Sequence, residues 1–442
     1  MKTVGLITEY NPFHNGHKYH MEEARRLSGA DYVIVVMSGN FVQRGAPAVI
    51  DKYSRTEMAL QQGADLVLEL PVCYATGSAE FFAHGAVSLL DKLGVVDYLC
   101  FGSECGQLKL LMQVAKFLST APGSYQDSLR TCLKAGLTYP AARLKALTQS
   151  LEGPEAAEAH LLAQVLAEPN NILGIEYLKA LLYFQSDIQP LTLKRISSHY
   201  HDIHLSGHLP GPHSSLSEAQ EAEAEQQEEI ISSATSVRRA LQQETASGRD
   251  LCQIKNSVPV EVFKMLQTSH TRTCPITEED FSALIKYRLL TEDRKTLSGY
   301  QDITGDLADR LKKIADYNKT ISELAQDIKT KNMTLTRINR ALLHLLLNIR
   351  TENVREYNKN GYTQYARILG LRKQSSTLLR QIEEVCRLPL LTRVSNAKEL
   401  LPSLGLQMLS EDITAAHLYN QAVYEKYHSA ILNEYRHGTV IL

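Results

Sequence analysis

The chain has 442 residues, which is enough for roughly two or three domains. Its composition, with 44% hydrophobic and 22% charged residues, is typical of a globular protein. The formal net charge of −2 argues against a protein that is basic throughout. Seven cysteines without a CxxC pair argue against a disulfide framework or a structural zinc site. There is no N-terminal signal pattern, and no apolar run approaches the ~20 residues of a membrane span. We therefore expect a cytoplasmic protein with no membrane segment.

Strand and helix patterns alternate along the first hundred residues. The strand-like runs are short and apolar, as in DYVIVVM, and the segments between them have helical periodicity, as in HKYHMEEARRL. Such alternation predicts βαβ units, and continuous hydrophobicity suits strands that are covered on both faces of a parallel sheet. The expected fold is α/β, a Rossmann-like doubly wound parallel sheet. Strands are predicted over residues 3–8, 31–37, 65–70 and 96–102, and helices over residues 17–27, 51–63 and 78–94.

The pattern changes in the middle of the chain. Residues 107–179 are mostly helical in pattern, and residues 190–196 indicate one more strand. The next stretch is rich in Gly, Pro and Ser and then carries six glutamates with no basic residue. Because such a composition cannot bury a core, residues 206–229 are expected to form an acidic surface loop. Beyond residue 248 no strand signal is convincing. We therefore expect a first domain over residues 1–247 and a mainly α-helical C-terminal domain over residues 248–442.

Three histidines, His14, His17 and His20, lie three apart where the first strand gives way to a helix that is expected to begin at His17. A helix N-terminus presents unpaired backbone N–H groups and the positive end of the helix dipole, so it binds phosphate readily. Imidazoles beside it can stabilise charge that develops on an α-phosphate. Two other interpretations stay open: an ordinary polar turn, and a metal site, for which no fourth ligand of suitable spacing follows.

Two segments resemble the signatures of the nucleotidylyltransferase superfamily. The sequence HNGH after the first strand is similar to the HxGH signature, and IISSATSVRRAL, residues 230–241, is similar to the ISSTxIR segment that closes over β- and γ-phosphates. In the second segment the hydroxyls can donate, the arginine supplies fixed charge, and the serines can cap the following helix. Taken alone, this segment is equally consistent with a well-capped helix. Its candidate phosphate ligands are Ser232, Ser233, Thr235 and Arg238.

A larger set of segments resembles the bacterial tRNA(Met) cytidine acetate ligase family. They are GLITEYNPFHNGH, SGNFVQRG, ADLVLELPV, FGSE, EPNNILGIEYL and LKRISSHYHD. The resemblance implies a fold of the nucleotidylyltransferase type and a ligase that uses ATP to activate acetate as acetyl-adenylate. It implies that the acceptor is the exocyclic amine of the wobble cytidine in elongator methionine tRNA, and it implies no protein partner. The ATP site implied by the resemblance contains Ile7, Thr8, Glu9, Tyr10, Asn11, Pro12, Phe13, His14, Asn15, Gly16, His17, Lys18, Tyr19, His20, Gly102, Asn170 and Arg195.

The loop SGNFVQRGAP, residues 38–47, follows the second strand and is therefore expected at the same carboxyl edge of the sheet as the histidines. Asn40, Gln43 and Arg44 are candidates to face acetate or the incoming base, and an ordinary βα loop is the alternative. Asn170 is alternatively a helix cap, and Arg195 is alternatively a partner in a surface ion pair.

No residue is assigned to a metal. The histidines between residues 199 and 213 are the best metal candidates, but their irregular spacing is typical of a solvated loop. The catalytic roles are given to His14 and His17 as donors to phosphate. Mg²⁺ is expected to arrive with ATP, because it typically binds through phosphates and water.

Local charge is uneven in the second half. Residues 331–380 contain ten basic residues and two glutamates, so ten minus two gives a local charge of +8. Interleaved tyrosines would add base stacking to phosphate attraction. Two arginines are expected to share the exposed face of a helix whose leucines pack on the domain. We therefore predict tRNA binding here, although a charge run is also typical of a solvated face. The residues concerned are Arg337, Arg340, Tyr357, Tyr362 and Tyr365.

Two other functions compete with the RNA-acetylating ligase. One is a nucleotidylyltransferase that modifies a small phosphorylated metabolite, and the large basic helical region argues against it because a small acceptor needs no such surface. The other is a non-catalytic RNA-binding protein that retains a nucleotide fold, and the intact HNGH and SSATSVRR segments argue against it.

Overall fold

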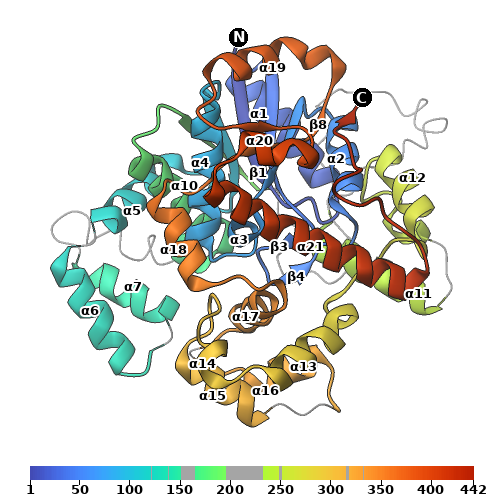
Figure 1. Cartoon of the computed structure of the whole chain (residues 1–442). Helices are drawn as coiled ribbons and strands as arrows, with labels where there is room; N and C mark the ends of the chain where they lie inside the picture. The colour runs from blue at the N-terminus through green and yellow to red at the C-terminus, as the bar shows by residue number, and fades with distance from the viewer. Residues whose placement is uncertain are drawn as a thin grey trace, which may run out of the picture.

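The computed structural model describes residues 1–120, 122–137, 139–150, 165–195, 232–247, 251–314, 318–331 and 333–442. The predicted acidic loop over residues 206–229 and the histidines between residues 199 and 213 lie outside these described residues. Figure 1 shows a central sheet with helices packed on both faces and a further group of helices below it. In the described part of the chain, no helix has the length and apolar character needed to cross a membrane.

The central sheet has the strand order β10-β8-β5-β2-β1-β6-β7. Its five N-terminal strands are parallel, and β1 lies between β2 and β6. The chain therefore runs outward from β1 on one side and returns to β6 on the other, which places the switch point of this doubly wound sheet between β1 and β6. The five strands predicted from the sequence are confirmed. They are β1 (Thr3–Thr8), β2 (Tyr32–Ser38), β5 (Leu66–Leu70), β6 (Tyr98–Ser103) and β7 (Gln189–Lys194).

Three more strands come from the second half of the chain, so the prediction that no strand follows residue 248 is wrong. β8 (Ala366–Leu371) pairs antiparallel with β5, and β9 (Leu390–Leu391) and β10 (Val440–Ile441) pair parallel with β8. The six-residue run ARILGL is too short for its periodicity to separate a buried strand from a helix. The domain division at residue 248 stays a prediction, and it would leave β8 within the sheet of the first domain.

Alternate residues of the strands face two hydrophobic cores. Val33 and Val35 of β2 pack in one core, and Ile34 and Val36 pack in the other. Because this period of two is what a strand imposes, both faces of the sheet need a cover of helices. The first core is covered by α1 (Asn15–Ser28), α2 (Lys52–Gln61), α11 (Ala234–Ser247) and α12 (Val260–Ser269), and the second by α3 (Val72–Ala75), α4 (Ala79–Leu93), α5 (Leu108–Thr120) and α10 (Pro169–Phe184).

The second half of the chain is mainly helical, as predicted. Helices α17 (Leu335–Leu347) and α21 (Ser403–Tyr427) lie beside a small antiparallel hairpin of β3 (Phe41–Val42) and β4 (Ala46–Pro47) (Figure 1). All the leucines of α17 except Leu335 at its start are buried, which confirms the amphipathic pattern expected of this helix. The other helices are α6 (Gly123–Lys134), α7 (Tyr139–Ser150), α13 (Ser282–Thr291), α14 (Arg294–Leu297), α15 (Gly305–Ile314), α16 (Ile321–Ile328), α18 (Thr351–Lys359), α19 (Ser376–Val385) and α20 (Ala397–Leu400), with short 3-10 turns η1 (Leu251–Ile254), η2 (Glu278–Phe281), η3 (Lys373–Ser375) and η4 (Val394–Asn396).

Candidate active site

The histidine turn, residues 9–17 with His14 and His17, joins β1 to α1 at the switch point of the sheet. Helix α1 begins at Asn15 rather than at His17, because the imidazole of His14 serves as its N-cap. The backbone N–H of Gly16 donates to Nδ1 of His14 over 3.1 Å, and the backbone N–H of His14 donates to Nδ1 of His17 over 3.3 Å. The two rings stack with their centroids 3.7 Å apart. The two histidines are therefore held rigidly at the N-terminus of a helix, where phosphate binds well.

These hydrogen bonds determine which nitrogen of each ring carries the proton. A backbone N–H can only donate, so Nδ1 of both rings must accept and the neutral rings carry their proton on Nε2. Burial, followed by the charges of Arg195 and Arg238, lowers the pKa of His14 to about 3. Burial first, and then the neighbouring charges, hold the pKa of His17 well below its usual value. At neutral pH the turn therefore offers two uncharged Nε2–H donors.

Other residues of the predicted segment support the turn from within. Tyr10 and Phe13 are fully buried and lie against the ring of His17, with centroids 4.9 and 5.6 Å away. The side-chain Oδ1 of Asn11 accepts from the backbone N–H of Val49 over 2.7 Å. Ile7 and Thr8 end β1, and Gly16, Lys18, Tyr19 and His20 lie in the first turns of α1. Burial and the charge of Arg195 lower the pKa of His20 to about 4.

The second signature lies directly against the first. Ser233 caps α11, because the backbone N–H of Ser236 donates to its Oγ over 3.1 Å, as the sequence predicts. Arg238 of the same helix donates to the backbone carbonyl of Asn11 over 2.7 Å and to Oγ1 of Thr235 over 3.0 Å. Its charge is one of those that lower the pKa of His14. The chain thus brings together two segments that are more than two hundred residues apart in sequence.

Ser232 has a supporting position. Its side chain is 1% exposed, and its Oγ lies 2.9 Å from Oγ of Ser257. The backbone carbonyl of Ser257 in turn accepts from the N–H of Asn15 over 3.1 Å. This chain of contacts fastens the start of α11 to the start of α1, so Ser232 positions the two signatures relative to each other.

Gly102 and Arg195 meet on the other side of the switch point. A Cβ atom on Gly102 would lie 3.2 Å from Cγ of Arg195, so the arginine lies over this glycine of β6. The backbone N–H of Arg195 donates to the carbonyl of Ser103 over 2.9 Å, and the Arg195 side chain is exposed. Its charge lowers the pKa of the histidines of the turn. Two arginines from different segments, Arg195 and Arg238, therefore act on the histidine pair through their charges.

Asn170 is held by a carboxylate that the sequence analysis did not single out. Its Nδ2 donates to Oε1 of Glu104 over 2.6 Å, and the backbone N–H of Asn171 donates to Oε2 of Glu104 over 2.8 Å. Glu104 therefore caps α10, which begins at Pro169, and Asn170 is not itself the cap. A role of Asn170 in ATP binding stays a prediction.

The loop after β2 carries the three predicted acetate or base contacts. Oδ1 of Asn40 accepts from the backbone N–H of Lys52 over 2.8 Å, and Asn40 is buried. The backbone N–H of Gln43 donates to Oε1 of Glu9 over 3.0 Å. Arg44 follows at the turn of the hairpin and is exposed. Asn40 therefore holds the base of the loop, and substrate contacts by all three side chains stay predictions.

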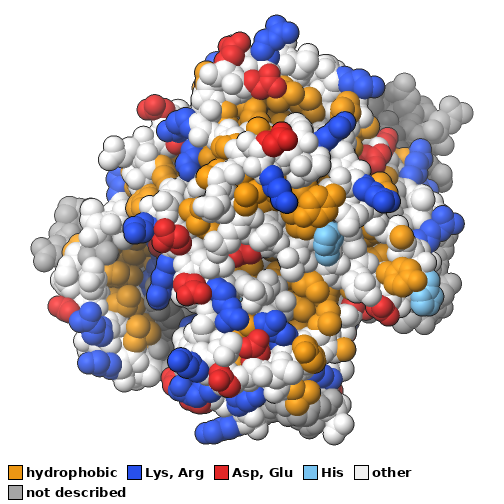
Figure 2. Space-filling view, in the orientation of Figure 1, with side chains coloured by type: hydrophobic (Ala, Val, Ile, Leu, Met, Phe, Trp, Pro, Cys, Tyr) orange, Lys and Arg blue, Asp and Glu red, His pale blue; other side chains and the backbone are white. Residues whose placement is uncertain are grey.

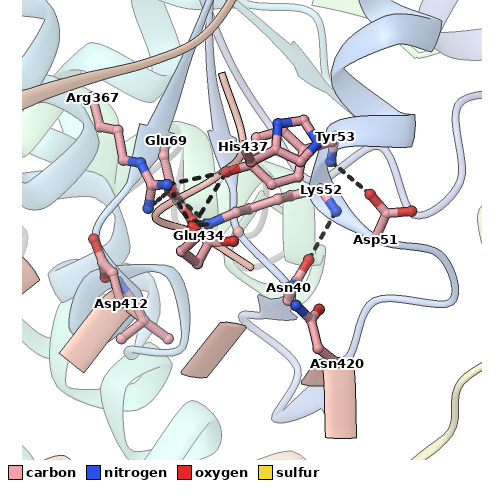
Figure 3. A network of polar contacts seen from close by, with 12 residues as sticks. Asn40, Asp51, Lys52, Tyr53, Glu69, Arg367, Asp412, Asn420, Glu434 and His437 are labelled. Atoms are coloured by element: carbon pink, nitrogen blue, oxygen red, sulfur yellow. Dashed lines mark hydrogen bonds and ion pairs between the residues drawn. The ribbon is translucent and has the colours of Figure 1, made fainter. Parts of the chain in front are cut away.

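A buried network of four charges lies beside this loop (Figure 3). Nζ of Lys52 is 2.7 Å from Oε1 of Glu69 and 2.9 Å from Oε2 of Glu434. The guanidinium of Arg367 pairs with both carboxylates, with 2.9 Å to Oε2 of Glu69. All four side chains are at most 5% exposed. Two cations and two anions balance, which is how buried charges become tolerable.

The sequence contained only part of the signal for this network. Glu69 interrupts the apolar strand DLVLEL, and an ionisable residue inside a buried strand needs a partner. The cations that pair with Glu69 come from α2 and β8, and the second carboxylate of the network comes from the C-terminal segment after α21. Two neighbouring carboxylates, Glu411 and Asp412 of α21, are also buried, and burial raises the pKa of each to about 7.

The basic window of residues 331–380 is less available to RNA than its composition suggests. Arg340 pairs with Asp302 over 2.9 Å and is 15% exposed, and Arg367 belongs to the buried network. The expectation that the tyrosines are free for base stacking is wrong for Tyr357 and Tyr365. Both are fully buried, because their hydroxyls donate to the carboxylates of α21. The exposed basic residues of the window are Lys331, Arg355, Lys359, Lys373 and Arg380, and Arg337 is half-buried.

Comparison with known proteins agrees with this geometry. A family model described as HIGH nucleotidyl transferase matches residues 1–217 and 215–434. A protein of Acetivibrio thermocellus named tRNA(Met) cytidine acetate ligase is 38% identical over 419 residues, which cover 95% of this chain and 94% of the relative. A protein of the same name from Caldanaerobacter subterraneus subsp. tengcongensis is 38% identical over 423 residues, 96% of each chain. The chain belongs to the tRNA(Met) cytidine acetate ligase family.

Solved structures of the same family have the same fold as this chain. The crystal structure of Thermotoga maritima TmcAL bound with alpha-thio ATP has a TM-score of 0.85 and 30% sequence identity, and each chain is covered completely. The apo structure of the same protein has a TM-score of 0.87. The predicted membership of the cytidine acetate ligase family and the predicted fold of the nucleotidylyltransferase type are thus confirmed.

Proposed function

We propose that this chain is an ATP-dependent ligase that activates acetate as acetyl-adenylate. It then acetylates the exocyclic amine of the wobble cytidine of elongator methionine tRNA. The observation that carries the proposal is the pair of neutral, Nε2-protonated histidines at the N-terminus of α1, with Arg195 and Arg238 close enough for their charges to lower the pKa of His14. The names of the relatives supply the substrates. A tRNA-modifying enzyme works where tRNA is found, so we place the protein in the cytoplasm.

In the first step an acetate oxygen attacks the α-phosphorus of ATP, and the bond to the bridging oxygen of pyrophosphate breaks. Negative charge builds up on the α-phosphoryl oxygens, and no covalent protein intermediate is required. The Nε2–H groups of His14 and His17 and the N–H groups of α1 are donors already held in position, so little reorganisation opposes the reaction. Arg195 and Arg238 would balance the charge of the triphosphate.

In the second step the cytidine amine attacks the carbonyl carbon of the acetyl group. The bond from that carbon to the phosphate oxygen breaks, AMP leaves, and the amine loses a proton. The acceptor is a large polyanion, and the exposed basic residues of the second half of the chain are suited to hold its phosphates. We propose that residues 1–247 form the adenylate site and that residues 248–442 bind most of the RNA.

Mg²⁺ fits this proposal as a companion of ATP. Within the described residues, no group of three or more His, Cys, Asp or Glu side chains could hold a metal ion. The ion would therefore be held by the phosphates and water, as is usual for Mg²⁺, and would neutralise charge on the leaving pyrophosphate. The chain groups proposed to surround ATP, such as the Nε2–H groups of His14 and His17, are hydrogen-bond donors. They would bind the phosphoryl oxygens that the ion does not contact.

The proposal is tested by incubating the protein with ATP, labelled acetate and candidate RNAs. Acetate should stimulate ATP–pyrophosphate exchange without RNA, and label should enter methionine tRNA at cytidine. Exchange that requires a small phosphorylated metabolite in place of acetate would identify a nucleotidylyltransferase. RNA binding with no exchange under any condition would identify a non-catalytic binding protein.

Replacing Arg238 by alanine should weaken ATP binding by about 10- to 100-fold, because a charge-assisted hydrogen bond to phosphate contributes about 1.5–3 kcal/mol. AMP binding should change little, since AMP lacks the β- and γ-phosphates that we assign to this arginine. The matched control is Arg239→Ala, the exposed neighbour on α11. Binding of both nucleotides is measured by calorimetry, and equal losses for ATP and AMP would contradict the assignment.

A further inference from the structure

The hairpin of residues 41–47 connects two parts of the molecule that the proposed function assigns to different substrates. It leaves the carboxyl end of β2, beside the histidine turn, and extends to α17 and α21 (Figure 1). Its two strands are two residues each, paired antiparallel. So short a hairpin is not stable alone in water, and its position is determined by what it contacts.

On the helical side the hairpin is fixed by backbone contact. Gly45 has a φ of +79°, and a Cβ atom there would lie 2.5 Å from the carbonyl carbon of Asn339 and against the backbone N of Arg340. Only glycine allows the hairpin and α17 to approach so closely. The face of α17 that meets Gly45 is itself held by the ion pair between Arg340 and Asp302.

An aromatic side chain adds to this contact. Phe41 is fully buried, and its ring lies 5.5 Å from the ring of Phe281 and 6.1 Å from that of Tyr419, both in edge-on geometry. The Tyr419 hydroxyl donates to the carbonyl of Ala48 over 2.9 Å, just after the hairpin. These contacts join the hairpin to η2 and α21 as well as to α17. The hairpin is therefore packed as a rigid part of the helical region.

On the other side the hairpin is tied to the histidine turn. Oε1 of Glu9 accepts from the backbone N–H of Gln43, at the tip of the hairpin. The fully buried guanidinium of Arg55 donates to the carbonyls of Glu9 and Ser38 over 2.6 and 3.0 Å, so it holds the start of the loop to the end of β1. Asn40 and the buried network of four charges that contains Lys52 hold the base of the loop (Figure 3).

We propose that this hairpin is the spacer that sets where bound RNA presents its acceptor amine relative to the adenylate, with Gly45 and Phe41 as positioning residues. The inference rests on the proposed function and adds to it the element that aligns the second step. Acyl transfer needs the amine within about 3–3.5 Å of the carbonyl carbon, and a displacement of about 1 Å can cost about 10²-fold in rate. Under the proposed function ATP reacts at the histidine turn, so we expect the first step to depend on that alignment much less than the second.

The test is Gly45→Ala, which adds one methyl group against the backbone of α17. The matched control is Gly136→Ala, because Gly136 has a similar φ of +84° but nothing within 4 Å of a new Cβ. We expect the rate of acetyl transfer at saturating RNA to fall by about 10- to 100-fold in Gly45→Ala. RNA affinity and acetate-dependent exchange should stay within about twofold of wild type, as both should in the control.

A second variant covers the case in which Gly45→Ala does not fold. Phe41→Leu keeps the volume roughly but removes the ring contacts with Phe281 and Tyr419, and it should show the same selective loss of transfer. Folding of each variant is checked by circular dichroism. Transfer at the wild-type rate in a folded variant, or exchange that falls in step with transfer, would overturn the inference. Wild-type protein that shows no acetate-dependent exchange would instead overturn the proposed function.

Discussion

Replacing His17 by asparagine should lower acetate-dependent ATP–pyrophosphate exchange by about 10²–10³-fold in a protein that stays folded. Asparagine Oδ1 can take the place of Nδ1 as acceptor for the backbone N–H of His14, so the cap of α1 is kept. What is lost is the Nε2–H that we assign to the α-phosphate. His14→Asn should behave in the same way, because the two histidines form one capping unit.

The control for this prediction is His428→Asn, which changes an exposed histidine after the end of α21. Its φ of +54° is one that asparagine tolerates, so this variant should leave exchange and stability within experimental error. Exchange at the wild-type rate in a folded His17→Asn protein would rule out the assignment of this histidine. A loss of exchange in His428→Asn would show that the assay reports folding rather than chemistry.

The low pKa of His14 leads to a prediction about how the stability of the protein depends on pH. An unfolded histidine titrates near 6.5, whereas burial and the neighbouring arginines hold the pKa of His14 at about 3 in the folded protein. Between these values the unfolded chain binds more protons, so the stability that His14 contributes is complete above about pH 6.5 and is lost as the pH falls towards 3. The exchange rate should accordingly show no titration step near pH 6.5 from these histidines.

Replacing Glu434 by glutamine should lower the free energy of unfolding by about 3–5 kcal/mol, because it breaks a buried ion pair on one side only. Lys52 and Arg367 would then face the single carboxylate of Glu69, which leaves one uncompensated positive charge in the interior. The loss is measured by chemical denaturation. The matched control is Glu425→Gln, an exposed carboxylate on α21, which should change stability by less than about 0.5 kcal/mol.

A double variant separates charge from packing. Lys52→Met combined with Glu434→Gln removes one cation and one anion, so the remaining pair of Arg367 and Glu69 is again balanced. We expect the double variant to lose less free energy of unfolding than the two single variants lose together, with a difference of about 0.5–3 kcal/mol. Strict additivity would mean that the four groups do not act as a network.

The pH dependence of this network has a definite sign. Burial alone would raise the pKa of Glu434, but the charges of Lys52 and Arg367 outweigh it and hold the pKa at about 2. The unfolded carboxyl titrates near 4.5. The stability that Glu434 contributes is therefore complete above about pH 4.5 and is lost as the pH falls through about 2. In the Glu434→Gln variant this acid-sensitive part of the free energy of unfolding should be missing.

Much of the fold and of the candidate phosphate site could be predicted because the relevant patterns are local. The run DYVIVVM is rich in β-branched residues and favours a strand covered on both faces, and the helical segments between such runs favour a parallel sheet. The turn HNGH follows the first strand, so the position of its histidines at a helix N-terminus follows from chain order alone. Ser233 caps α11 for the same reason: a cap is decided by residues three apart.

The tertiary structure alone decided which charges and rings face solvent. Tyr357 and Tyr365 lie in a basic stretch of sequence, yet they are buried because Glu411 and Asp412 of α21 accept their hydroxyl groups. Composition counts charges but cannot show that a partner from a distant helix neutralises them or covers the rings beside them. The availability of a side chain to RNA is therefore not a local property.

The parallel strands around β1, the histidine turn at the start of α1 and the cap of α11 could each be recognised from a short run of neighbouring residues. No local pattern indicates that β8 joins the sheet beside β5 or that Glu434 meets Lys52 across 382 residues. The same holds for the hairpin of two-residue strands that joins the histidine turn to α17. Burying a charge, closing a sheet edge and fitting a glycine against a helix all depend on partners that only the folded chain brings together.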